Sequence, residues 1–360
     1  MPRAGRTRLI LTLAKRRTTR KKARMIYYRP IAMTDAARPA GALTLAGGWC
    51  WFAHAEVLTR KGSEGLIAAR DIPANVADRL TAPRAPLAGL TFAVPRIMGV
   101  LNTTPDSFSD GGRFNSPDAA LAQAHDLAAS ADILDIGGES TRPGAAEVTV
   151  DEEIARTAPL IAALRAGGMT VPISVDTRKA KVADAALAAG ASMVNDVAAL
   201  TFDAALADLV ARNAVPLCLM HAQGSPATMQ LAPQYDDVLL DVYDFLADRI
   251  AVAEAAGIPR SRIVVDPGIG FGKTQTHNLG LVRGLSLFHG LGCAILLGAS
   301  RKRFIGSIGQ EDRADRRGPG TIAVTLAGVA QGVQLHRVHD TSDIRQALRL
   351  WQAVTEEDKR

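Results

Sequence analysis

Polar and charged side chains close a series of short apolar runs in the second part of the chain. The eight runs cover residues 97–101, 133–136, 171–175, 192–194, 215–220, 263–265, 294–297 and 333–338. The side chains at their ends are Asn102, Asp135, Asp176, Asn195, His221, Asp266, Lys302, Arg337 and His339. Asp176, Asn195 and Asp266 offer acceptors and an amide that can pair with a flat, nitrogen-rich heterocycle through several hydrogen bonds at once.

The cationic side chains of this set suit an anion. Guanidinium forks at Arg142 and Arg337, with His339 and the N–H groups of Gly/Ser loops, match phosphate or pyrophosphate oxygens. Side chains alternate along a strand, so Arg337 and His339 should point the same way. Lys302 is the expected neutralising cation for the buried carboxylates. Mg²⁺ is expected on the pyrophosphate with Asn102 as a ligand, because Mg²⁺ commonly takes only about one or two protein ligands beside phosphate and water.

The elements that position these residues repeat as apolar run, polar loop and helical pattern. Continuous apolar strands alternating with helices predict a parallel sheet covered by helices. Eight repeats over about 260 residues favour a (β/α)₈ barrel, in which all strand ends meet at one face. An open Rossmann sheet would need Gly-x-Gly-x-x-Gly after its first strand, and none is present. Residues 268–274 mimic a P-loop, but Pro267 stands where the motif requires glycine.

Helix ends are marked in the sequence as well. Thr149 and Glu152 form a capping-box pattern, and Ser116 precedes Pro117 as an N-cap before a first-turn proline. Gly190 and Gly257 stand where helices should stop. His221 is interpreted as a structural histidine.

Composition narrows the function classes. The chain has 360 residues, of which 48% are hydrophobic, and a formal charge of +6. Eleven of its 42 basic residues and none of its 36 acidic ones fall in residues 1–34, so the remainder is net acidic. A nucleic-acid-binding fold with a built-in basic face is therefore disfavoured. Three widely spaced cysteines indicate neither a disulfide framework nor a structural zinc site, and a reducing, cytoplasmic setting fits best. No apolar run approaches the roughly 20 residues that span a bilayer.

Three regions are predicted along the chain. Residues 1–34 form a basic tail without regular packing, interpreted as a solvated tail or an early start codon, with a transit peptide and an anion-binding arm as alternatives. Residues 35–93 form a small accessory segment with a hairpin around Gly47 and Gly48, a helix at 72–80 and a Pro/Gly linker, and no chemistry is expected there. Residues 94–357 form the barrel.

Six ordered motifs together resemble the dihydropteroate synthase family. They begin at Asn102 (NTTPDSFSDGG), Asp135 (DIGGESTRPG), Ile173 (ISVDT), Asp266 (DPGIGFGK), Ser300 (SRK) and Arg337 (RVH). The resemblance implies a (β/α)₈ barrel that condenses 6-hydroxymethyl-7,8-dihydropterin diphosphate with 4-aminobenzoate. The products are 7,8-dihydropteroate and pyrophosphate, and Mg²⁺, a homodimer and sulfonamide binding are implied as well.

The resemblance also assigns roles to positions of this chain. It implies pterin contacts for Asp176, Asn195, Asp266 and Lys302, and diphosphate and metal contacts for Asn102, Arg337 and His339. It implies an aminobenzoate pocket shaped by Phe108, Thr141, Arg142, Pro143, Phe271 and Ser300. Lys302, Asp176 and Arg337 are the expected catalytic residues. Two loops that include Asp106, Ser107, Phe108 and Pro143 are expected to act as lids.

Three positions depart from the usual family pattern: Thr103, Ile269 and Ala222. None removes a named polar contact, so they bear on pocket shape. Three other functions stay open. They are a pterin-barrel methyltransferase, an inactive paralogue that only binds pterin, and additional nucleic-acid binding through residues 1–24. The methyltransferase should lack the Thr-Pro-Asp-Ser-Phe and Ser-Thr-Arg-Pro loops.

Overall fold

Eight parallel strands close into one barrel in the computed structural model, which describes residues 25–103, 117–140, 147–224 and 229–355. Each strand pairs with the next along the chain, and the last returns to the first with Arg337 opposite Met98. The strands are β6 (Arg96–Asn102), β7 (Ile133–Gly137), β8 (Ile173–Asp176), β9 (Met193–Asp196), β10 (Leu217–Met220), β11 (Ile263–Asp266), β12 (Ala294–Leu297) and β13 (Leu335–Val338). The predicted (β/α)₈ barrel is confirmed.

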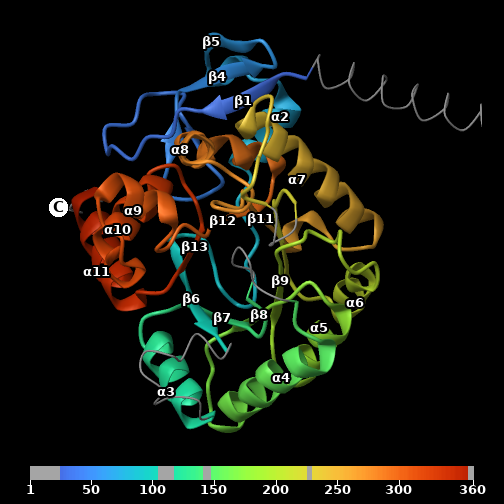
Figure 1. Cartoon of the computed structure of the whole chain (residues 1–360). Helices are drawn as coiled ribbons and strands as arrows, with labels where there is room; N and C mark the ends of the chain where they lie inside the picture. The colour runs from blue at the N-terminus through green and yellow to red at the C-terminus, as the bar shows by residue number, and fades with distance from the viewer. Residues whose placement is uncertain (1–24, 104–116, 141–146, 225–228, 356–360) are drawn as a thin grey trace, which may run out of the picture.

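Helices ring the strands (Figure 1). They are α3 (Pro117–Ala128), α4 (Val150–Ala166), α5 (Ala180–Ala188), α6 (Ala205–Asn213), α7 (Val238–Ala255), α8 (Gln275–Arg283), α9 (Arg303–Gly309), α10 (Gly318–Val329) and α11 (Thr341–Thr355). Short 3₁₀ turns lie at η3 (Arg260–Arg262), η4 (Leu285–Leu291) and η5 (Ala314–Arg316).

The helix-end signals are confirmed where the structure describes them. The Thr149 side chain accepts from the N–H of Glu152 at the start of α4. Gly190 and Gly257 follow α5 and α7 with φ of +112° and +94°, a conformation that glycine adopts at little cost. Ser116 lies outside the described residues.

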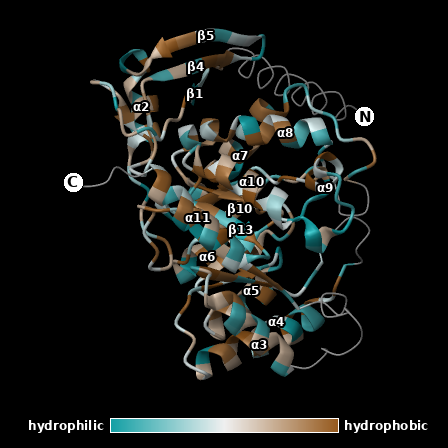
Figure 2. Cartoon of the chain, turned by 90° about the vertical axis from the view of Figure 1, so that its left-hand side faces the viewer, coloured by the Kyte–Doolittle hydropathy of each residue, from teal (hydrophilic) through white to brown (hydrophobic). Residues whose placement is uncertain are grey.

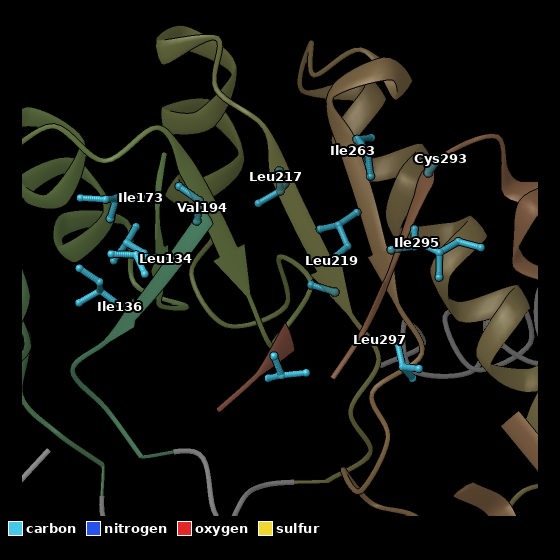
Figure 3. Packing of buried hydrophobic residues seen from close by; sticks show 14 of the residues in the cluster. Leu134, Ile136, Ile173, Val194, Leu217, Leu219, Ile263, Cys293, Ile295 and Leu297 are labelled. Atoms are coloured by element: carbon cyan, nitrogen blue, oxygen red, sulfur yellow. The ribbon is translucent and has the colours of Figure 1, made fainter. Parts of the chain in front are cut away.

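The main core lies between the strands and the helix ring. Alternate strand residues point outward, and Figure 3 shows this set, including Leu134, Ile173, Val194, Leu219 and Ile263. The helices that cover them carry hydrophobic and hydrophilic residues side by side (Figure 2). Each fully buried leucine or isoleucine stabilises the fold by about 1.5 to 3 kcal/mol.

The other alternate residues point into the barrel, and their character changes along the barrel axis. The layer nearest the amino ends of the strands, which we call the lower end of the barrel, is apolar. It consists of Met98, Ile133, Met193, Cys218, Val264, Ala294, Leu296 and Leu335. Leu87 and Phe92, from the predicted linker, join this cluster and close the lower end. Two residues further along, five of the strands place a polar side chain at the inward position: Asp135, Asp176, Asn195, Asp266 and Arg337. The barrel interior is therefore apolar at the amino ends of the strands, which we call the floor, and polar at their carboxyl ends, which we call the mouth.

The N-terminal part forms a second, smaller unit against the barrel (Figure 1). Strands β1 (Tyr27–Pro30), β4 (His54–Thr59) and β5 (Gly62–Ala68) make an antiparallel sheet in the order β1-β4-β5. Strands β2 (Leu43–Thr44) and β3 (Trp51–Phe52) form the predicted hairpin around Gly47. A 3₁₀ turn, η1 (Ala69–Asp71), leads toward α2 (Ala74–Thr81), which matches the helix predicted at 72–80.

This unit corrects the boundary placed at residue 34. Tyr27–Pro30 belong to a paired strand, with Tyr28 opposite Val57. Polar contacts fasten the unit to the barrel helices. The Tyr27 hydroxyl donates to Asp244 Oδ1 over 2.9 Å, and Trp49 Nε1 donates to the Val329 carbonyl over 2.8 Å. The end of the predicted tail is therefore part of the fold.

Candidate active site

Arg337 lies at the centre of the barrel mouth. From β13 its Nε donates to Asp135 Oδ2 over 2.6 Å, and its Nη2 donates to Asp176 Oδ2 over 2.7 Å. Asn195 Nδ2 donates to the same Asp135 oxygen over 3.0 Å. These four side chains from β7, β8, β9 and β13 form one hydrogen-bonded layer, which we call the mouth cluster.

Burial governs the electrostatics of the mouth cluster. Desolvation raises the pKa of Asp176 to about 7, with Arg337 opposing the rise and the Asp135 carboxylate adding to it. Burial also disfavours the charge on Arg337, but the two carboxylates outweigh it and hold the Arg337 pKa above its ordinary value. Asp135 Oδ1 is buried with no hydrogen-bond partner in the described chain. A ligand N–H group at this oxygen would offset the cost of burying an unpaired acceptor.

Asp266 lies at the end of β11, where a glycine-rich loop begins. Its Oδ1 accepts from the Gly268 N–H over 2.7 Å, and burial raises its pKa to about 6. Gly268 has φ +66°, and a Cβ there would lie 1.8 Å from the His221 carbonyl oxygen. Only glycine fits this approach, so the tight loop depends on it.

Lys302 and Phe271 meet above this loop. The Lys302 Nζ lies 4.1 Å from the centre of the Phe271 ring, a cation–π distance. The Lys302 charge also opposes the rise in the Asp266 pKa. The prediction that Lys302 neutralises the carboxylates needs correction for Asp176, because the cation hydrogen-bonded to Asp176 is Arg337.

Ser300 and His339 form a second pair at the same rim. Ser300 Oγ lies 3.0 Å from His339 Nδ1. Burial, with the nearby Arg301 and Arg337 charges, lowers the pKa of His339 to about 3, so its ring is neutral at physiological pH.

Asn102 ends β6 beside Gly137, and the neighbouring Thr103 joins the ends of β6 and β7. The Thr103 hydroxyl donates to the Gly137 carbonyl over 3.0 Å. Of the other two departures, Ile269 is fully buried in the main core and Ala222 is partly buried next to His221. Asp106, Ser107, Phe108, Thr141, Arg142 and Pro143 lie outside the described residues.

Comparison with known proteins decides the family. The sequence profile described as "Pterin binding enzyme" matches residues 98–339, from β6 to just beyond β13. The dihydropteroate synthase of Neisseria meningitidis serogroup C is 48% identical over 265 residues, covering 72% of this chain and 93% of that protein. This chain belongs to the dihydropteroate synthase family.

Solved structures of the dihydropteroate synthase family share the fold. The Xanthomonas albilineans dihydropteroate synthase with 4-aminobenzoic acid superposes with a TM-score of 0.71 at 46% identity, covering 76% of this chain and 99% of that one. The same enzyme in complex with 7,8-dihydropteroate gives 0.69 at 44% identity, with 76% and 100% coverage. The mouth cluster lies within the part of the chain that the family profile matches.

Sequence reasoning gave no role to two buried charged residues of the candidate site. Asp135 was recognised as a strand end but given no role, although its place two residues after the inward Ile133 points it into the barrel. Lys273 was set aside with the P-loop. It is buried, with Nζ 2.9 Å from His221 Nδ1 and from the Phe271 carbonyl oxygen. Burial lowers its pKa to about 7 and that of His221 to about 2.

The donor set suits a metal brought by the substrate. No group of three or more His, Cys, Asp or Glu side chains able to hold a metal occurs in the described ranges. Asn102 offers a neutral oxygen at the end of β6, and Mg²⁺ needs few protein ligands when phosphate oxygens supply the others. The residues thus fit Mg²⁺ carried on a diphosphate.

Among the described residues, no helix has the length and apolar character of a membrane span.

Proposed function

We propose that this chain joins 6-hydroxymethyl-7,8-dihydropterin diphosphate to 4-aminobenzoate and releases 7,8-dihydropteroate and pyrophosphate. The observation that carries the proposal is the mouth cluster, since buried carboxylates and an amide on neighbouring strands suit the N–H and N groups of a pterin. The family relationship gives the reaction. Its relatives include structures with 4-aminobenzoic acid and with 7,8-dihydropteroate.

In the proposed complex, Asp176 and Asp266 each bind a different part of the pterin. Asp176 and Asp266 accept from the amino and ring N–H groups, and Asn195 pairs through its amide. Arg337 holds Asp135 and Asp176 in place from one guanidinium. Lys302, fixed above Phe271, faces the ring beside Asp266. Phe271 and Ser300 line the aminobenzoate side, as the family resemblance implies.

The chemistry needs charge stabilisation rather than a covalent nucleophile. The C–O bond to the diphosphate breaks with its electron pair leaving on pyrophosphate, and the electron-rich pterin stabilises the methylene cation. The amine of 4-aminobenzoate then attacks and loses a proton. Stabilising the leaving group and positioning the amine supply most of the rate, and Arg337 and His339 are the described residues that suit this task. Mg²⁺ would be held at Asn102 and would neutralise diphosphate charge.

Further properties follow from the resemblance. We expect sulfonamides to compete with 4-aminobenzoate, and we propose a homodimer that uses late outer helices such as α10. We also propose the cytoplasm, because the three cysteines are free and buried. Light scattering of the purified chain tests the dimer, and a monomer at micromolar concentration contradicts it.

Lys302→Ala tests the catalytic assignment. Loss of the ammonium above Phe271 should lower kcat/KM by about a hundredfold or more, because preorganised charges at a reacting centre carry effects of that size. Unfolding by urea should change by no more than about 1 kcal/mol. Arg303→Ala, the exposed next residue, is the matched control and should retain activity. Near-normal kinetics in Lys302→Ala would contradict the role.

Pyrophosphate release tests the reaction itself. The full chain, pterin diphosphate, Mg²⁺ and 4-aminobenzoate should give pyrophosphate only when both substrates are present. Calorimetry in parallel separates an inactive paralogue, which would bind the pterin without turnover. Methyl transfer from a methylated folate would instead support the pterin-barrel methyltransferase.

A further inference from the structure

A cavity of about 350 Å³ lies between the accessory unit and the lower end of the barrel. Its lining comes from α2 and the segment after it, from η3 and from the residues that lead into β12. These are the amino ends of β11 and β12, so the cavity lies at the end of the barrel opposite the mouth cluster. The charged side chains of its lining are Arg79, Arg84, Arg260 and Asp78.

Arg84 is the most buried of these, with 9% of its surface exposed. It donates to the carbonyl oxygens of Ala82 over 2.9 Å and of Arg79 and His289 over 3.0 Å. These carbonyls fix the guanidinium in orientation, but its Nε is buried without a hydrogen-bond partner in the described chain. Burial lowers the pKa of Arg84 to about 10, so it keeps its positive charge at neutral pH.

Arg79 and Arg260 converge on Gly292. A Cβ at Gly292 would lie 3.4 Å from Arg260 Cδ and 3.5 Å from Arg79 Cγ, so the two stems flank this glycine. Arg260 pairs with Glu254 over 2.8 Å, whereas Arg79 Nε donates to the Gly290 carbonyl over 3.0 Å. Glycine at this position leaves the space between the stems open.

The charges of the lining do not cancel. Within the described ranges, neither Arg79 nor Arg84 forms an ion pair with a carboxylate, whereas Arg260 does. Asp78 is the acidic residue of the lining, and it is exposed. Arg79 and Arg84 therefore line a small cavity in which the single carboxylate of Asp78 compensates only part of their positive charge, an arrangement that favours an anion.

We propose that this cavity binds a small molecule or ion through a phosphoryl group. A phosphoryl dianion matches the two guanidinium charges, with Arg84 held in place by its carbonyl partners and acting through its charge, and Arg79 nearest the open space beside Gly292. The volume lies at the lower end of the range of about 300 to 1,000 Å³ for small-molecule pockets, so the ligand is compact. The site is separate from the proposed catalytic site and goes beyond the proposed function.

Titration calorimetry of the full chain tests the site with two probes, inorganic phosphate and ribose 5-phosphate, at low ionic strength. Arg79→Gln should weaken binding about tenfold, since it removes one charged hydrogen-bonding group. Asp78→Asn should tighten binding several-fold, because it removes the negative charge of the lining. Arg70→Gln, an arginine of the same unit with its side chain 86% exposed, is the control and should not change affinity.

The two probes distinguish the sources of the phosphoryl group. Equal affinities would assign the cavity to free phosphate, and tighter binding of the sugar phosphate would assign it to a phosphorylated metabolite. The proposed catalytic site at the barrel mouth also suits phosphate. A change of affinity in Arg79→Gln and Asp78→Asn therefore shows that the probe binds in the cavity and not at the catalytic site. No saturable binding of either probe, or affinities unchanged in both Arg79→Gln and Asp78→Asn, would overturn the proposal.

Discussion

Arg337 serves two carboxylates from one guanidinium, and this arrangement makes the barrel mouth sensitive to a single side chain. Asp135 is fully buried and Asp176 largely so. Removing the cation from such a pair leaves buried negative charge that no solvent stabilises. The same guanidinium also orients the oxygens that we propose to meet the pterin.

Arg337→Met should lower the free energy of unfolding by about 3 to 5 kcal/mol at pH 8. The loss should shrink toward pH 5, because Asp176 becomes protonated there, and kcat/KM should fall by about a hundredfold or more. Arg345→Met is a matched control, since the side chain of Arg345 is also 22% exposed. Its partner Asp132 still has an ion pair with Arg96 in this variant, so no carboxylate is left unpaired. Denaturation at two pH values checks this, and equal losses in both variants would contradict it.

The raised pKa of Asp266 makes the stability of the folded chain fall as the pH rises. Burial raises its folded-state pKa from 3.8 to about 6, so between these values the folded chain binds a proton that the unfolded chain releases. Stability therefore falls as pH rises through this window, by about 3 kcal/mol for a shift of about two units. Relative to Asp266→Asn, the parent chain should lose this amount between pH 4 and pH 6.5. A parallel pH profile of the two proteins would exclude the shift.

At this scale, sequence reasoning predicted the residue types but not their pairing. Alternation along β13 predicted that Arg337 and His339 point the same way. In the structure Arg337 contacts two carboxylates of the mouth cluster, and His339, just beyond the end of β13, contacts Ser300. Which carboxylate Arg337 would reach was not readable, because Asp135 and Asp176 lie 202 and 161 residues away and meet it only when the barrel closes. Lys302 was chosen instead because it follows a strand end.

Among the elements, the three-stranded accessory sheet depends on a few polar contacts with α7. Arg60 pairs with Asp241 and Asp244, and Asp244 also accepts from Tyr27. The Asp244 side chain is only 3% exposed, so this contact is a buried one. The anchoring of the sheet therefore rests on charge as well as on apolar packing.

Arg60→Met should destabilise the chain by about 2 to 4 kcal/mol, because it removes a cation from a buried carboxylate. Arg29→Met is the comparison within the same sheet. Its partner Glu56 is partly exposed, and such pairs contribute about 0 to 1 kcal/mol. Urea denaturation of both variants measures the difference, and similar values would show that the Asp244 contact does not anchor the sheet.

The barrel elements could be predicted because each strand is a continuous apolar run between loop signals. The hairpin was predicted from hydrophobic residues on both sides of Gly47 and Gly48, and α2 was predicted as a helix at 72–80. Strand β1 was not, because it is four residues long and follows a basic stretch without periodicity. Its pairing with β4, about 30 residues away, is what makes Tyr27–Pro30 a strand.

Across the whole molecule, the two ends of the barrel have different tasks. The lower end is an apolar floor completed by Leu87 and Phe92, and the upper end holds the mouth cluster. Barrels of this kind commonly place chemistry at the carboxyl ends of the strands and stability at the other end. Substitutions at the floor should therefore change stability without changing the reaction.

Phe92→Ala should lower the free energy of unfolding by about 3 to 5 kcal/mol, the usual cost of truncating a buried phenylalanine. At a temperature where the variant is fully folded, kcat should stay within about twofold of the parent. Thermal unfolding and steady-state kinetics on the same preparation check both parts. A large fall in kcat with intact folding would mean that the two ends are coupled.

The reaction itself is the central claim, and direct detection of its product tests it most directly. The purified full chain should form 7,8-dihydropteroate, identified by mass, from pterin diphosphate and 4-aminobenzoate with Mg²⁺, with one pyrophosphate released per product. The yield should fall sharply in Lys302→Ala and persist in Arg303→Ala. Absence of dihydropteroate at saturating concentrations of both substrates, from a chain that is folded and binds the pterin, would contradict the account.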